Sequence, residues 1–219
     1  MGARHGARME PRHYSVSRAK KEPLVRFIRE ALERSGCRLL HEPDPGVAPY
    51  RFTFETPDGE RLGILVYAFF ANSQKTLNRP DDEHRFQVKY SAKTGGQHTL
   101  WQDPYALYTT LFCGIDPERG IFVGADPVLH SPVTAPISIK FLESHVRRIL
   151  RHGWFAWEYE PRIGPIQVLV GGTAENFLRL VRFEREALGE APGHRHLLAE
   201  NLAPNRPADE APLPFRKTG

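Results

Sequence analysis

The chain has 219 residues, of which 40% are hydrophobic and 26% charged, ordinary values for a soluble globular domain. It contains no apolar run near the roughly 20 residues of a membrane span, and its basic start lacks the apolar segment of a secretory signal, so we expect a cytoplasmic protein without membrane contact. The net charge of +4 is a mild lean toward polyanionic partners, and two cysteines without zinc-ligand spacing argue against a disulfide framework or structural zinc.

Charge and proline content divide the chain into three parts. Residues 1–21 are rich in Lys and Arg with Glu10 as the only acid, which predicts a flexible basic arm that either lies along a phosphate backbone or is simply solvated. Residues 189–219 contain five prolines and predict an extended tail or strap. We therefore expect one folded domain over residues 22–188.

The first half of that domain predicts a helix followed by strands. Residues 22–40 place Leu24, Phe27 and Ile28 at helical spacing, with Gly36 as a stop. Residues 50–56 alternate, a turn follows, and residues 61–72 are apolar and rich in strand formers, which predicts a β-hairpin. A third strand is expected over residues 85–91.

The second half mixes further helices and strands. We expect a helix running into a strand over 102–115, a strand over 120–127, a basic helix over 138–154, a strand over 166–172 and a helix over 173–188 capped by Thr173. Asp116 and Asp126 are expected to form turns. The order predicts a mixed α/β fold with a central sheet flanked by helices.

The stretch RPDDEHRFQVKYSAK, residues 79–93, carries the most suggestive polar pattern. Asp81, Asp82 and Glu83 precede the third strand, along which Gln87 and Lys89 share one face because strand side chains alternate. A lysine on such a strand is costly to bury, so it either reaches solvent or neutralises a nearby negative charge.

These residues resemble the motif of the PD-(D/E)XK nuclease superfamily. Pro80-Asp81 stands for its PD, and Gln87-Val88-Lys89 stands where its (D/E)-x-K tripeptide falls on the third strand. Gln87 in place of the second carboxylate is similar to the Q-x-K variants of some restriction enzymes, and either Asp81 or Asp82 can be the acid. The resemblance covers about residues 24–126 and implies a restriction-endonuclease-like core.

The resemblance implies a magnesium-dependent DNA endonuclease in restriction, defence or repair. Its catalytic residues would be Asp81, Asp82, Gln87 and Lys89, with Mg²⁺ held by Asp81, Asp82 and Glu83 and a water activated on the metal. The partner would be double-stranded DNA, and a homodimer would suit double-strand cuts. Expected DNA contacts are Lys75, Arg79, Arg85, Lys93, Arg147, Arg148 and Arg151.

Two other interpretations stay open. The acids can form an exposed turn while Lys89 makes an ion pair at a strand edge. Alternatively, the chain resembles modules of bacterial restriction systems that read DNA without cutting it, with Arg79 and Arg85 flanking the binding surface. The aromatic residues Trp154, Phe155 and Trp157 are either core or a stacking surface for bases, and His194 and His196 are expected at the surface.

Overall fold

The computed structural model describes residues 10–72, 80–87, 100–130, 138–162 and 164–202. The helices are α1 (Arg18–Arg34), α2 (Glu143–His152), α3 (Phe177–Glu186), α4 (Pro192–Asn201) and the single 3₁₀ turn η1 (Ala174–Asn176). The strands are β1 (Tyr14–Ser15), β2 (Arg38–His41), β3 (Val47–Ala48), β4 (Tyr50–Glu55), β5 (Arg61–Asn72), β6 (Glu83–Gln87), β7 (Tyr108–Asp116), β8 (Ile121–Ala125), β9 (Ser138–Leu142), β10 (Trp154–Tyr159) and β11 (Gln167–Thr173).

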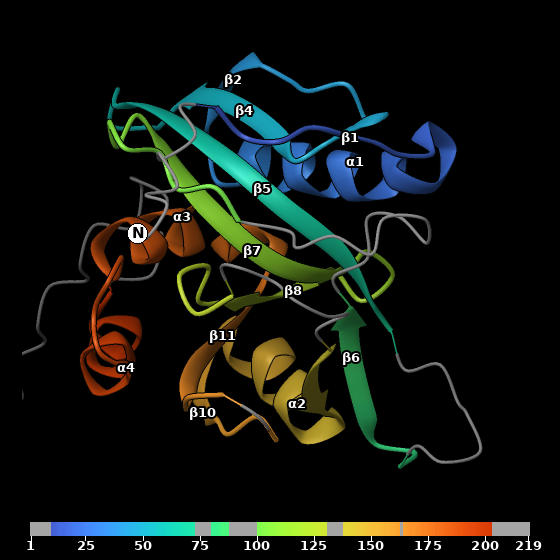
Figure 1. Ribbon diagram of the computed structural model, residues 1–219, viewed down its shortest axis with the longest axis vertical. Helices are drawn as coiled ribbons and strands as arrows, with labels where there is room; N and C mark the ends of the chain where they lie inside the picture. Colours follow the sequence, from blue (N-terminus) through green and yellow to red (C-terminus); the bar gives the residue numbers. More distant parts are fainter. Residues whose placement is uncertain (1–9, 73–79, 88–99, 131–137, 163, 203–219) are drawn as a thin grey trace, which may run out of the picture.

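The main sheet is mixed and runs through the centre of the molecule (Figure 1). Its strand order is β10-β11-β8-β7-β5-β4-β2, and β6 pairs with the end of β5 and with β9. The long strand β5 runs parallel to β7, while its hairpin partner β4 is antiparallel to it. β1 and β3 form a separate two-stranded pair. The expected mixed α/β fold with a central sheet flanked by helices is therefore confirmed.

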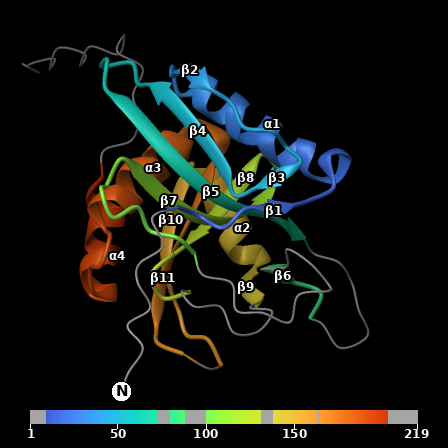
Figure 2. The ribbon, with the colours of Figure 1, turned by 45° about the horizontal axis from the view of Figure 1, so that its top comes forward.

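The helices cover opposite faces of this sheet. Gly124 on β8 pairs with Val170 on β11 and lies under Leu180 of α3. Gly171, the residue that follows Val170 on β11, lies under Ile149 of α2. Because neighbouring residues of a strand face opposite sides, α3 and α2 lie on opposite faces. α1 shares the α3 side, and β6 and β9 lie at the end of β5, near α2 (Figure 2).

The first helix and the hairpin agree with the sequence. Helix α1 buries Leu24, Phe27 and Ile28, and it begins earlier than expected, at Arg18. The strands β4 and β5 form the predicted antiparallel hairpin. The third strand begins at Glu83, and residues 88–91 of its expected range lie outside the described residues.

The helix expected from residue 102 is wrong, because residues 102–107 contain no helix and residues 104–107 form a turn and a bend before β7. The Asp103 carboxylate accepts hydrogen bonds from the backbone N–H groups of Tyr105, Leu107 and Tyr108 at 2.9–3.0 Å. An Asp side chain that takes nearby backbone donors in this way competes with helix formation. The second helix of the nuclease-like core is thus absent from residues 102–107.

The basic helix begins at Glu143, so its expected start at residue 138 is wrong. Residues 138–142 form β9, whose Ile139 and Phe141 are buried while Lys140 between them is exposed. This alternation has the period of a strand, and β6 supplies the pairing partner. Leu150 of this helix is 51% exposed and does not pack against the sheet as Val146 and Ile149 do.

The last segments also depart from expectation. Thr173 makes no side-chain cap, and its Oγ1 instead accepts a hydrogen bond from Asn176 Nδ2 at 3.2 Å before α3 begins at Phe177. In the proline-rich C-terminal segment, Pro192–Asn201 is helical rather than extended. Pro192 starts α4, a position where its missing N–H costs nothing. Within the described residues, no helix is long and apolar enough to cross a membrane.

Candidate nucleic-acid interface

Helix α2 presents a basic outer face. Val146 and Ile149 anchor it to the sheet and are fully buried, whereas Arg147, Arg148 and Arg151 are exposed on the other side. Gly153 ends the helix in the left-handed conformation, φ 74°, which Gly adopts without strain. The structure thus brings the three arginines predicted from this segment onto one surface.

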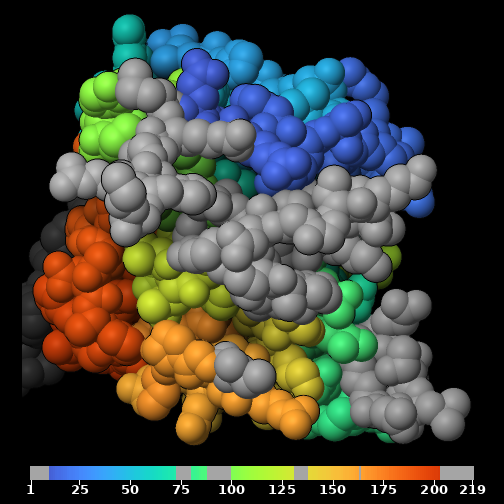
Figure 3. Space-filling model, in the orientation of Figure 1, coloured from blue at the N-terminus to red at the C-terminus, as the bar shows by residue number. Residues whose placement is uncertain are grey.

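The acidic turn and β6 lie beside the start of α2. The backbone N–H of Glu143 donates to the Asp82 carbonyl oxygen at 2.8 Å, which fixes the turn carrying Asp81 and Asp82 against the first residue of the helix. Both of these acids are exposed. The space-filling view shows the yellow surface of β9 and α2 adjoining the green surface of β6 (Figure 3).

The other predicted residues of this stretch are placed as follows. The Glu83 carboxylate is almost buried and lies 3.1 Å from Lys140 Nζ on β9. Arg85 is half-buried opposite Lys140, and Gln87 is exposed at the end of β6. The remaining predicted site residues lie outside the described residues: Lys75, Arg79, Lys89 and Lys93. Among the described residues, no three His, Cys, Asp or Glu side chains converge as a metal-ligand group.

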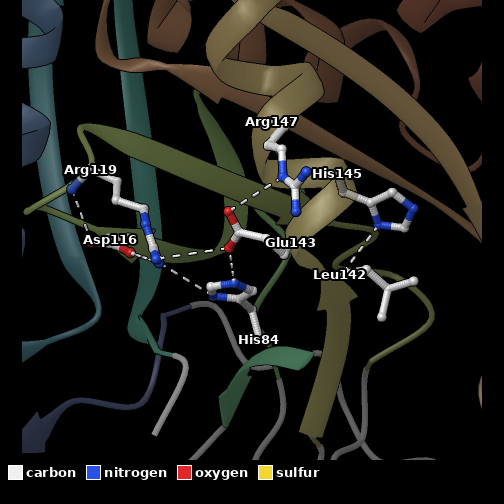
Figure 4. A network of polar contacts seen from close by, with 7 residues as sticks. All are labelled: His84, Asp116, Arg119, Leu142, Glu143, His145 and Arg147. Atoms are coloured by element: carbon white, nitrogen blue, oxygen red, sulfur yellow. Dashed lines mark hydrogen bonds and ion pairs between the residues drawn. The ribbon is translucent and has the colours of Figure 1, made fainter. Parts of the chain in front are cut away.

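Glu143 lies at the centre of a polar network at the start of α2 (Figure 4). Its Oε2 lies 2.8 Å from His84 Nε2 and 3.8 Å from Arg119 Nη2, and its Oε1 lies 3.8 Å from Arg147 Nε. Arg119 Nη1 also lies 3.5 Å from His84 Nδ1 and 3.3 Å from Asp116 Oδ2. The network joins β6, the turn between β7 and β8, and α2.

The buried imidazole of His84 determines how this network is ordered. His84 is 2% exposed, and its ring stacks on Phe141 with 5.3 Å between centroids. A guanidinium can only donate, so Nδ1 facing Arg119 is the unprotonated nitrogen, and Nε2–H donates to Glu143. His84 therefore holds the carboxylate of Glu143 from inside the protein, while the side chain of Glu143 keeps 32% exposure.

Aromatic side chains pack along the other edge of α2. The Trp157 ring stacks on Phe155 with 5.5 Å between centroids, and the Arg148 guanidinium lies 5.0 Å from the Phe155 centroid. Trp154 and Trp157 are buried, so the interpretation as core applies to both tryptophans.

Burial, and next the charge of Arg148, lower the pKa of His145, whose ring lies 4.5 Å from Trp157. A neutral imidazole suits its contact with the Leu142 N–H.

A family model called methylase-associated X1 matches residues 62–181, more than half of the chain. The chain belongs to the methylase-associated X1 family. No curated protein and no solved structure matches the chain.

The methylase-associated X1 match runs from β5 into α3, so it contains β6, β9, α2 and all of the network around Glu143. The resemblance to PD-(D/E)XK nucleases has no counterpart in these comparisons.

The sequence did not single out His84, Arg119, Lys140 or Glu143 as site residues. His84 sits between Glu83 and Arg85 in a polar run, and only its alternation with Phe86 indicates an inward position. Arg119 and Glu143 are ordinary charged residues of a turn and a helix start. Their common site arises from the pairing of β6 with β9, which no local pattern reports.

Proposed function

We propose that this chain is a DNA-binding component of a methylase-associated restriction–modification system and that it contacts duplex DNA through α2. One observation carries the proposal: Arg147, Arg148 and Arg151 are exposed together on a helix that is anchored by its opposite side. No described carboxylate lies within ion-pair distance of Arg148 or Arg151, so their charge is available to a partner.

Phosphate is the partner that this surface fits best. Three exposed guanidinium groups within one ten-residue helix suit a polyanion, and a nucleic acid backbone supplies closely spaced negative charge. Lys140, 53% exposed on β9, and Arg119, 38% exposed after β7, add two further cations past the start of the helix, each paired with an acid of this region. The family description, which names a methylase association, favours DNA over other polyanions.

Fluorescence anisotropy with a labelled DNA duplex tests the proposal. We expect Arg147→Gln/Arg148→Gln/Arg151→Gln to weaken binding by about tenfold or more. Each cation that is lost lowers the number of counterions that binding releases from the DNA. The matched control is Arg26→Gln/Arg29→Gln/Arg34→Gln on α1, which removes the same charge on the other side of the sheet. Equal losses in both triple variants would contradict a role for α2.

A second candidate function is magnesium-dependent DNA cleavage. The observation that favours it is the hydrogen bond from Glu143 N to the Asp82 carbonyl oxygen, because it places the exposed acids Asp81 and Asp82 beside the basic helix. Carboxylate oxygens suit Mg²⁺, which proteins often hold by one or two carboxylates together with substrate phosphates. Glu83 is committed to Lys140, so Asp81 and Asp82 are the acids that would hold the ion.

Bound Mg²⁺ would supply an activated water and charge stabilisation at a phosphate. Gln87, at the end of β6, and Lys89, two residues further along the sequence, would orient that water and stabilise negative charge. The test is conversion of supercoiled plasmid to the nicked form with Mg²⁺ or with EDTA. Nicking that needs Mg²⁺ and disappears in Asp81→Asn/Asp82→Asn and in Lys89→Ala supports cleavage; no nicking, or equal nicking in all variants, leaves DNA binding as the function.

A further inference from the structure

Glu143 is an acid in the middle of the surface to which we assign DNA binding. A carboxylate repels phosphates, so at this position it opposes backbone binding. Its carboxylate is nevertheless held in one position by a 2.8 Å hydrogen bond from the buried His84. An acid at the first residue of a helix also interacts favourably with the positive end of the helix dipole, but that interaction needs no buried partner.

A fixed carboxylate on a DNA-facing helix can act as a reader of bases. It accepts hydrogen bonds and cannot donate them, and the donors in the major groove are the amino groups of cytosine and adenine. The N-terminal residues of a helix lying in that groove are the ones that reach base edges. Glu143 is the first residue of α2.

Arg147 decides between the two bases. It lies one turn after Glu143 and contacts the Glu143 carboxylate through Nε at 3.8 Å, which leaves its two terminal nitrogens for another partner. Guanine offers two acceptors, O6 and N7, which match the paired donors of an arginine. In a C·G pair the cytosine amino group and guanine O6 are neighbours, as are the charged groups of Glu143 and Arg147.

Resting on the proposed DNA-binding function, we infer that Glu143 and Arg147 read a C·G base pair in the major groove, with His84 as the positioning residue. Glu143 accepts the major-groove N–H of the cytosine amino group, and Arg147 donates to guanine. The cytosine amino group has two N–H bonds, one in the base pair with guanine and one in the major groove. An N4-methyl group that preserves the base pair takes the place of the major-groove hydrogen, which is the donor that Glu143 uses. The site would therefore respond to methylation of the base it reads.

The test starts from a randomised duplex library bound to the wild-type protein, to Glu143→Gln and to Glu158→Gln. Glu158 is an exposed acid on β10, so this control makes the same charge change away from α2. We expect a shared C·G pair in the duplexes bound by the wild type and by the control, and no such pair for Glu143→Gln. In anisotropy, N4-methylcytosine at that position should weaken wild-type binding about tenfold and change Glu143→Gln binding little.

His84→Leu separates positioning from contact: we expect it to lose the preference for the C·G pair while still binding duplexes, with thermal unfolding as the check on its fold. A wild-type protein that binds duplexes without base preference, or a Glu143→Gln variant with an unchanged preference, would overturn the inference and leave DNA binding standing. A wild-type protein that binds no duplex would overturn the proposed function itself.

Discussion

Arg195 on α4 and Glu184 on α3 form an ion pair inside the protein, with Arg195 Nη2 lying 2.9 Å from both carboxylate oxygens of Glu184. Both side chains are essentially inaccessible, and Arg195 Nη1 also donates to the Ala187 carbonyl oxygen at 2.7 Å. Asp126, after β8, lies 3.4 Å from Arg195 Nε. Burial raises the pKa of Glu184 to about 7, with the Arg195 charge acting in the opposite direction.

Arg195→Ala should therefore destabilise the whole fold. Removing one member of a buried pair leaves the other without compensation, so we expect the free energy of unfolding to fall by about 3–5 kcal/mol. Urea denaturation measures this change. His196→Ala is the neighbouring control on α4, because His196 and Glu200, 3.4 Å apart, keep 28% and 61% side-chain exposure, and loss of this pair should cost less than about 1 kcal/mol. A small effect of Arg195→Ala would mean that α4 is held mainly by its apolar contacts.

The C-terminal segment shows why part of the fold could not be predicted. Its prolines predict an extended chain and its two histidines are expected at the surface, whereas Arg195 between them is buried and ties α4 to Glu184 of α3. A buried arginine has no sequence signature, because Arg is normally exposed. By contrast, α1 and the β4–β5 hairpin have strong apolar periodicity, and both were predicted correctly.

Gly171→Ala should loosen the contact between α2 and the sheet. A Cβ atom at Gly171 would collide with the fully buried side chain of Ile149, so this side chain or α2 itself would have to shift. Overpacking of this kind costs about 1–3 kcal/mol. Gly193→Ala is the matched control, because a Cβ there meets nothing within 4 Å and Ala favours the α4 helix by about 0.5–1 kcal/mol. In thermal denaturation, Tm should thus fall for Gly171→Ala and rise for Gly193→Ala.

The stability of the protein should depend on pH through His130. Burial lowers the pKa of His130 from its ordinary 6.5, and its Nε2 lies 3.0 Å from Gln167 Oε1. Below about pH 6.5 the unfolded chain takes up a proton at this residue that the folded protein does not, so stability falls as pH falls and is complete above that pH.

The measurement is the difference in unfolding free energy between wild type and His130→Asn over pH 5–8. We expect the advantage of the wild type to be constant above about pH 6.5 and to shrink below it, by at most about 1.4 kcal/mol per pH unit. Taking the difference cancels the other titrating groups. A difference that stays flat down to pH 5 would show that His130 titrates alike in both states.

The candidate site was predictable in one half only. The arginines of α2 could be read from the sequence, because Val146 and Ile149 at helical spacing define the buried side and leave the basic residues outside. The Glu143 network could not, since His84, Arg119 and Glu143 come from three distant segments that β6 and β9 bring together. Strand pairing between distant segments creates such a site, and the local hydrophobic periodicity of each segment does not predict which strands pair.

The salt dependence of DNA affinity separates the two kinds of contact that α2 is proposed to make. Arg148 and Arg151 are expected to bind phosphates, so replacing either by Gln should reduce the slope of log K against log salt by about one. Glu143→Gln removes no phosphate contact and should leave that slope unchanged or slightly steeper. Anisotropy titrations from 50 to 300 mM salt, at about neutral pH, give both slopes. A large fall in slope for Glu143→Gln would place Glu143 among the residues that organise phosphate contacts, instead of among those that read bases.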